Sequence, residues 1–156
     1  MTPEQRLADL GYALQDPPEG PDKPYEPLVQ IRGIVYGSGN TSMDRHAGRI
    51  YRGQLGADLD VEEAREYARI ATLNALAAFR AHLGTLDRIR RFVRLTGYVN
   101  SAPEFTRQAE VINAASQLLL DAFGERGRHA RSAIGVAQLP GGAAVEVEAI
   151  IEVEES

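Results

Sequence analysis

The side chains that most often carry covalent or metal chemistry are few in this sequence, and they lie far apart. The chain contains no cysteine, which excludes thiolate nucleophiles, disulfides and cysteine-ligated metals. His46, His82 and His129 share no short metal-ligand spacing, so we expect all three at the surface. Ser38 lies in a Gly-Ser-Gly-Asn run without a neighbouring acid and histidine, which disfavours a serine hydrolase. The same run lacks the lysine and the following helix of a phosphate loop.

Arginines gather in one stretch of the chain. Four lie between positions 88 and 94, and others follow at positions 126, 128 and 131. A solvated strand and turn accounts for this stretch, while the alternative is a surface that contacts RNA. Aromatic residues that would stack on RNA bases are sparse, and 17 basic against 22 acidic residues give a formal charge of −5. Nucleic acid is therefore disfavoured as a partner.

Length and composition are those of one soluble globular domain spanning 1–156. The chain is long enough to bury a single core, and its hydrophobic fraction of 44% and charged fraction of 25% are ordinary. No apolar run is long enough to span a bilayer, and residues 1–14 lack the apolar centre of a secretory signal. We therefore expect no membrane association and a cytoplasmic location.

Residues 1–24 are predicted to form a short helix and an arm, before a core at 25–156. Thr2 and Pro3 suit a helix start, and leucines follow at helical spacing. Four prolines and a glycine between positions 17 and 24 then disfavour both helix and central strand.

The core pattern predicts an α+β fold in which two long helices cover one face of a mixed sheet. Asp60 and Gly84 bound the first helix, while Ser101 with Pro103 and then Gly124 bound the second. Valines, one alanine and Ile151 alternate with Glu146, Glu148, Ile150 and Glu152 along the last strand, so its second face is free to meet solvent or another subunit. The predicted strands are 28–31, 34–36, 49–52, 89–99, 132–137 and 144–153, the last two forming an antiparallel hairpin around the 139–142 turn.

The C-terminal region resembles the signature of the YjgF/RidA superfamily. It reads RSAIGVAQLP at 131–140 and VEVEAI at 145–150, and the resemblance continues upstream through Tyr25, the Ser38-Gly39-Asn40 turn and 99–105. The chain is similar to a longer branch that carries an extra N-terminal helix and is described as endoribonuclease L-PSP or translation-inhibitor-like. This resemblance implies a chorismate-mutase-like fold and a homotrimer.

The resemblance also implies a pocket for a small carboxylate-bearing ligand at each subunit interface. Arg131 matches the arginine that grips the carboxylate, and its planar fork suits bidentate binding. Glu146 matches the glutamate that positions the hydrolytic water. The other matching pocket positions are Tyr25, Ser38, Gly39 and Asn113. The implied reaction is hydrolysis of a small enamine or imine acid, such as 2-aminoacrylate, to a 2-oxo acid and ammonia, with no cofactor and no metal.

Two points bear on this site. If the hairpin centre lies between Leu139 and Pro140, Glu146 becomes a diagonal neighbour of Arg131, with about 7 to 8 Å between their backbones. Ala133 stands where related deaminases often carry a cysteine, which changes the shape of the pocket.

The candidate residues also have ordinary structural explanations. Arg131 can be an interface salt-bridge partner, Glu146 part of a solvated strand face, and Tyr25 a cover for the sheet edge. Three functions therefore remain open. They are an enamine/imine deaminase, a trimer that binds a small ligand without catalysis, and an endoribonuclease.

Overall fold

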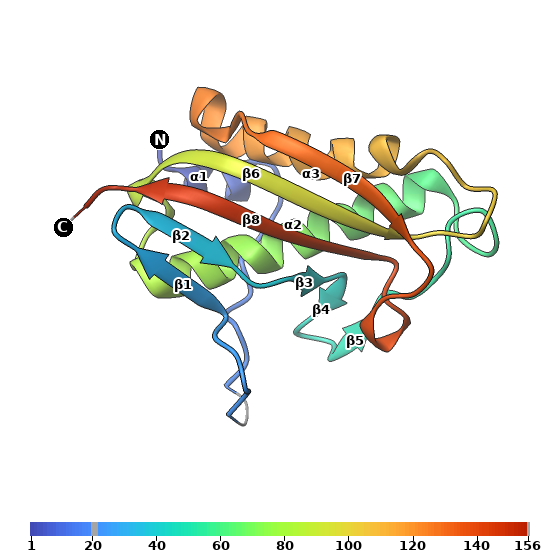
Figure 1. Cartoon of the computed structure of the whole chain (residues 1–156). Coiled ribbons are helices and arrows are strands. Elements are labelled where there is room, and N and C mark those ends of the chain that lie inside the picture. The colour runs from blue at the N-terminus through green and yellow to red at the C-terminus, as the bar shows by residue number, and fades with distance from the viewer. Residues whose placement is uncertain (20–21, 156) are drawn as a thin grey trace.

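One mixed sheet organises the chain in the computed structural model, which describes residues 1–19 and 22–155 (Figure 1). The sheet order is β1-β2-β8-β6-β7, and β3 extends it by pairing with β8. These strands are β1 Leu28–Ile31, β2 Ile34–Gly37, β3 Asn40–Thr41, β6 Ile89–Asn100, β7 Ala130–Val136 and β8 Val145–Val153. The helices are α1 Pro3–Asp9, α2 Val61–Leu83 and α3 Gln108–Phe123, and a small second sheet pairs β4 Met43–Asp44 with β5 Arg49–Ile50.

Both long helices cover the same face of the sheet, which confirms the predicted α+β architecture. Helix α2 packs against β8, whereas α3 packs against β6 and β7. The α2 face that meets the sheet is built largely from alanines, whose small side chains let the helix approach closely. The α2 alanines that belong to the hydrophobic core are Ala64, Ala68, Ala71 and Ala75.

The boundaries of α2 follow the predicted capping residues, whereas those of α3 do not. The Asp60 carboxylate accepts a hydrogen bond from the Glu63 amide at 2.8 Å, and Gly84 ends α2 with φ of +85°. The prediction that Ser101 and Pro103 open α3 is wrong. The Ser101 hydroxyl donates to the Val99 carbonyl at 2.7 Å, which holds it at the end of β6, and the helix begins only at Gln108.

The predicted antiparallel hairpin of the two C-terminal strands is also wrong. Strand β6 lies between β7 and β8, and it pairs with β7 in parallel and with β8 antiparallel. Helix α3 supplies the crossover that a parallel β6–β7 pair requires. The glycine-rich turn at 139–142 therefore joins two strands that are next-nearest neighbours, because the chain passes across the end of β6.

A β-bulge changes which side chains of β6 face the helices. The register shifts between Phe92 and Arg94, so Phe92 is buried at 1% exposure while Val93 is 40% exposed. A regular alternation along 89–99 would instead place Val93 with Leu95 on one face and Phe92 on the other. After the bulge the alternation is regular.

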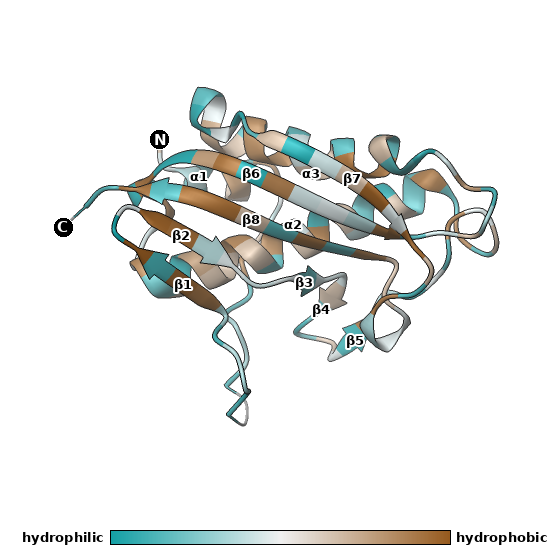
Figure 2. Ribbon diagram, in the orientation of Figure 1, coloured by the Kyte–Doolittle hydropathy of each residue, from teal (hydrophilic) through white to brown (hydrophobic). Residues whose placement is uncertain are grey.

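The second face of the sheet is uncovered in the single chain. Figure 1 shows both long helices behind the sheet and no helix in front of it. Cross-strand pairing places Tyr36 with Ile150, and Ile34 with Glu152, on this uncovered face. Several large apolar side chains near the sheet edges are strongly exposed, and Figure 2 shows apolar residues along β1 and β2. The exposed apolar side chains of the sheet strands include Val29, Ile31, Tyr36 and Ile134.

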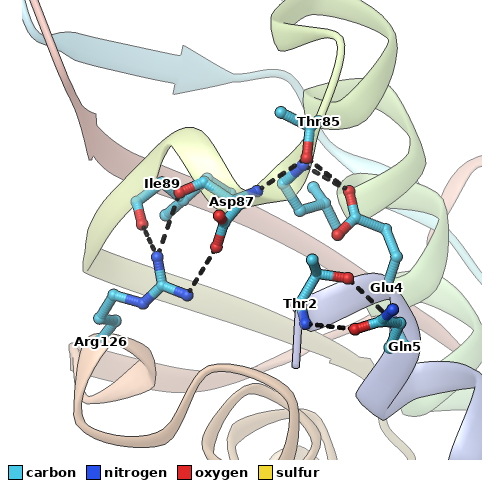
Figure 3. A network of polar contacts seen from close by, with 8 residues as sticks. Thr2, Glu4, Gln5, Thr85, Asp87, Ile89 and Arg126 are labelled. Atoms are coloured by element: carbon cyan, nitrogen blue, oxygen red, sulfur yellow. Dashed lines mark hydrogen bonds and ion pairs between the residues drawn. The ribbon is translucent and has the colours of Figure 1, made fainter.

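The N-terminal helix is present as predicted, but it ends at Asp9, so Leu14 lies beyond it. The Thr2 hydroxyl accepts from the Gln5 amide, and the Gln5 side chain accepts from the Thr2 amide (Figure 3). Glu4 Oε1 then accepts from the Leu86 amide at 2.6 Å and from the Thr85 hydroxyl at 3.1 Å. These contacts attach α1 to the segment that leads into β6.

Among the described helices, none has the length and apolarity needed to cross a bilayer.

Candidate functional site

Arg131 lies on edge strand β7 with its side chain turned toward α3. It pairs with Leu95, whose side chain is buried in the core, so both belong to the helix-covered face. Its Nη1 donates to Asn113 Oδ1 at 2.6 Å and to Ser116 Oγ at 3.3 Å. Within the described chain, Nε and Nη2 donate no hydrogen bond, and Arg131 enters no salt bridge. The Nε–Nη2 edge can therefore receive a carboxylate.

Asn113 and Arg131, two of the predicted pocket residues, are in contact in the structure. Asn113 projects from α3 at an exposed position, and its side-chain oxygen holds one arm of the guanidinium. The remaining amide of Asn113 is available to a ligand beside that arm. We call Arg131 and Asn113 the arginine half-site.

Glu146 lies on β8, on the uncovered face. It pairs with Tyr98 of β6 and with Thr41 of β3, which places the preceding turn beside it. A side chain on Gly39 would overlap the Glu146 carboxylate, so the carboxylate can lie this close to the turn only when position 39 is glycine. Partial burial raises the pKa of Glu146, and the nearby Glu148 charge raises that pKa further.

Ser38 serves the turn that carries Gly39. Its hydroxyl donates to the Glu26 carbonyl at 2.7 Å, and its own carbonyl accepts from Asn40 at 3.1 Å. These bonds set the path of the backbone against Glu146. We call Ser38, Gly39 and Glu146 the glutamate half-site.

Tyr25, the remaining predicted pocket residue, stands just before β1. It is 56% exposed, and the Lys23 ammonium lies 5.6 Å from the centre of its ring. Its side chain is free to contact another molecule.

The prediction that Glu146 is a diagonal neighbour of Arg131 is wrong within one chain. Strand β6 separates their strands, and their β6 partners, Leu95 and Tyr98, point to opposite faces of the sheet. The two half-sites of one chain therefore cannot hold the same small molecule.

Two further residues support Arg131, and the sequence did not assign either of them to the site. They are Ser116 and His129. Ser116 lies three positions after Asn113 on α3, a spacing that puts both on one helix face. His129 was expected at the surface, but it is half-buried, and its Nε2 lies 2.9 Å from the Ser116 oxygen. The helical spacing was a usable signal for Ser116; the contact of His129 depends on how β7 meets α3.

Tyr98 and Glu148 form a second polar contact that was not predicted. The Tyr98 hydroxyl donates to Glu148 Oε1 at 2.7 Å, which raises the pKa of Tyr98 to about 12. Together with Tyr36, Arg94, Thr96 and Ile150, Glu148 lines a shallow hollow of about 250 Å³ on the uncovered face. No group of three or more acidic, histidine or cysteine side chains suited to a metal is found in the described ranges.

A family model described as "YjgF/chorismate mutase-like, putative endoribonuclease" matches residues 5–150. The chain belongs to this YjgF family. The match covers β1 to β7, the first part of β8 and both half-sites, and it confirms the chorismate-mutase-like fold expected from the signature at 131–150. The YjgF-family match also covers most of the N-terminal extension.

Solved structures similar to this YjgF-family chain share its whole fold. Atu1372 from Agrobacterium tumefaciens, a protein of unknown function, is 41% identical, with a TM-score of 0.90 over 98% of this chain and 94% of that one. A structure from Shewanella oneidensis, described as a "putative endoribonuclease", is 34% identical, with a TM-score of 0.91 over 98% and 100% of the two chains. In sequence, the chain is also similar to Protein TCP17 of Trypanosoma cruzi, which is 54% identical over 106 residues, or 67% of this chain and 66% of TCP17.

Proposed function

We propose that this protein is a RidA-like deaminase that hydrolyses small enamine or imine acids, and that it works as a homotrimer in the cytoplasm. The observation that carries the proposal is the Arg131 guanidinium, whose Nη1 is held by Asn113 and Ser116 while its Nε–Nη2 edge stays unoccupied. A planar fork fixed in this way matches a substrate carboxylate bidentately. Small 2-imino and 2-enamino acids supply that carboxylate next to the reacting carbon.

Assembly is needed because the two half-sites of one chain lie on opposite faces of the sheet. A second copy can bring its glutamate half-site, with Tyr25, to the arginine half-site of the first. Strands β1 and β7 are the two edges of the main sheet, and both carry exposed apolar side chains, Ile31 and Ile134. Burying such residues between copies favours association. We expect a closed threefold ring to bury the uncovered face of each copy, with Ile150, together with these edge residues.

The chemistry then needs only an anchor and a positioned water. The enamine tautomerises to the imine, and water adds to its carbon while Glu146 accepts a proton from that water. The proton passes to the nitrogen and gives a carbinolamine. The hydroxyl proton of this carbinolamine is then also transferred to the nitrogen, the C–N bond breaks, ammonia leaves, and a 2-oxo acid remains. The raised pKa of Glu146 makes its carboxylate a stronger proton acceptor than that of an exposed glutamate.

A trimer that binds small carboxylates without catalysis is the second candidate, and the same free edge of Arg131 supports it. It differs from the deaminase in needing no base at Glu146.

Ribonuclease activity is the third candidate, and it is suggested by the description of the family and of the Shewanella relative. The basic stretch gives it little support. Arg126 is paired with Asp87 at 3.3 Å and Arg128 with Glu125 at 3.0 Å, which neutralises part of the patch that RNA would need.

A direct assay separates the candidates. 2-Aminoacrylate is generated freshly, and release of ammonia and pyruvate is followed with the wild type, Arg131→Ala and Glu146→Gln. The deaminase predicts acceleration by the wild type, loss in Arg131→Ala, and a fall of about 10² to 10⁴ in Glu146→Gln with the carboxylate still bound. Absence of any acceleration, with an active RidA protein as positive control, would exclude the deaminase and favour the binding trimer.

A further inference from the structure

Arg131 is the end of a hydrogen-bonded chain that begins at a backbone carbonyl. The Gly127 carbonyl oxygen lies 2.6 Å from His129 Nδ1, and His129 Nε2 lies 2.9 Å from Ser116 Oγ. Ser116 Oγ in turn lies 3.3 Å from Arg131 Nη1. The chain thus links the 3₁₀ turn Gly124–Gly127, the start of β7 and the middle of α3.

The first partner fixes a proton on Nδ1 of His129, and a neutral ring then sets the direction of the other bonds. A carbonyl oxygen only accepts, so Nδ1 of His129 carries a proton. A neutral imidazole has one N–H, which leaves Nε2 as an acceptor for the Ser116 hydroxyl proton. The Ser116 oxygen then keeps its lone pairs for the Nη1–H of Arg131. Each donor meets an acceptor in this way when His129 is neutral.

The surroundings of His129 favour this neutral form. Burial lowers the pKa of His129, the hydrogen bond to Gly127 raises it, and the positive charge of Arg131 lowers it again. Gly127 is buried against α3, and a side chain at this position would overlap the Leu119 backbone. The anchor of the chain is therefore held by the core.

We propose that Ser116 and neutral His129 are positioning residues that hold the Arg131 guanidinium with its Nε–Nη2 edge turned outward. Asn113 holds Nη1 from one direction at 2.6 Å, and Ser116 holds the same nitrogen from another. Two contacts on one arm restrict rotation of the planar group, so less rotational freedom is lost when a ligand binds. The role of Ser116 and His129 in ligand binding rests on the proposed function, whereas the hydrogen-bonded chain that they form does not.

Nuclear magnetic resonance of the full chain without ligand tests the chain directly. The expected result at neutral pH is an unprotonated Nε2 and a protonated Nδ1 in His129, together with slow rotation of the Arg131 guanidinium about its Nε–Cζ bond. Ser116→Ala should speed that rotation, and Ser116→Thr should restore the slow rate. A protonated Nε2 in His129, or rotation that Ser116→Ala leaves unchanged, overturns the proposal.

Calorimetry with 2-oxobutyrate as the probe tests the consequence for binding. Ser116→Ala and His129→Ala should each weaken affinity about three- to tenfold. The double variant should lose no more affinity than either single variant, because both residues act through the same contact. His129→Gln, which keeps an uncharged acceptor, should restore affinity to within about twofold of the wild type.

Gln117→Ala is the matched control, because Gln117 neighbours Ser116 in sequence, but among the described residues its side chain bonds only to Asp121, at 2.8 Å. Additive losses in the double variant, or an unchanged affinity in His129→Ala, contradict the positioning role. If the wild type does not bind 2-oxobutyrate, the proposed function fails, and the resonance experiment still decides whether the chain holds Arg131.

Discussion

Arg131 and Glu146 lie on opposite faces of one sheet, with β6 between their strands. Arg131 faces α3 and binds Asn113, whereas Glu146 faces outward beside Gly39. Any site that uses both residues must take them from different copies of the chain. Assembly and activity are therefore expected to be lost together.

Disruption of the uncovered face should dissociate the protein. Ile150 is half-buried on that face and pairs with Tyr36, so a charge in Ile150→Glu would be desolvated in an assembled trimer. We expect a trimer for the wild type and a monomer for the variant in small-angle scattering at micromolar concentration. Leu10→Glu, at an exposed site outside the sheet, is the control and should remain a trimer. A monomeric wild type would contradict the assembly.

Replacement of Arg131 should separate ligand charge from ligand shape. Arg131→Ala should abolish binding of small carboxylates, and Arg131→Lys should restore part of it, since an ammonium cannot reproduce the planar fork. The wild type should prefer an acid to the matching amide by about 2 to 5 kcal/mol. Isothermal calorimetry with pyruvate and its amide measures this difference, and equal affinities would eliminate the carboxylate clamp.

A methyl group at position 39 should impair catalysis more than binding. In Gly39→Ala the new side chain overlaps the Glu146 carboxylate and must displace it or the turn. Turnover should fall by about 10- to 100-fold, because a small misplacement of a catalytic group is costly. Affinity for a carboxylate at the arginine half-site should change little. Steady-state kinetics and calorimetry on the same preparation check both parts, and undiminished turnover would exclude a role for Glu146.

Removal of the Glu148 charge should shift the pH–rate profile. The pKa of Glu146 is raised by burial and by Glu148, and the base must be ionised to accept a proton. Glu148→Gln lowers the pKa of Glu146, so the acidic limb of the turnover profile should move to lower pH. The profile is measured from pH 4 to pH 8 at saturating substrate. A limb that stays in place would mean that another group titrates.

His129 should make folding stability fall in mild acid. Its pKa in the folded protein is lowered, so the unfolded chain binds more protons between that lowered value and about 6.5. The contribution is thus present above about pH 6.5 and is lost as pH falls toward the folded pKa. His129→Gln should flatten this dependence. Urea unfolding at several pH values tests it, and identical pH slopes for the two proteins would refute the assignment.

Local signals predicted the elements better than their arrangement. The Asp60 cap, the Gly84 stop and the alternation along β8 all act within a few residues, and each gave the correct element. The turn at 139–142 is equally compatible with a hairpin and with a connection that crosses a strand. Only the pairing of β6 with both neighbours decides between them, and this depends on residues far apart in sequence.

The candidate site likewise divides into residues that the sequence could identify and an arrangement that it could not predict. The identities of Arg131 and Asn113 came from a resemblance to relatives, and helix spacing could have added Ser116. The burial of His129 and the separation of Arg131 from Glu146 follow from strand order, which no local pattern contains. The bulge after Phe92 likewise has no marker in the sequence, since neither glycine nor proline stands there.

Strand β8 follows every other described element in the chain, yet it lies near the middle of the sheet, between β2 and β6. During synthesis, the β1–β2 hairpin and the β6–α3–β7 unit must therefore wait as two pieces with open edges. Open strand edges pair readily with other chains, so this interval is when the nascent protein is most exposed to aggregation. A chain cut before Val145 would keep both pieces in that condition permanently, and we expect it to require a chaperone or to be degraded.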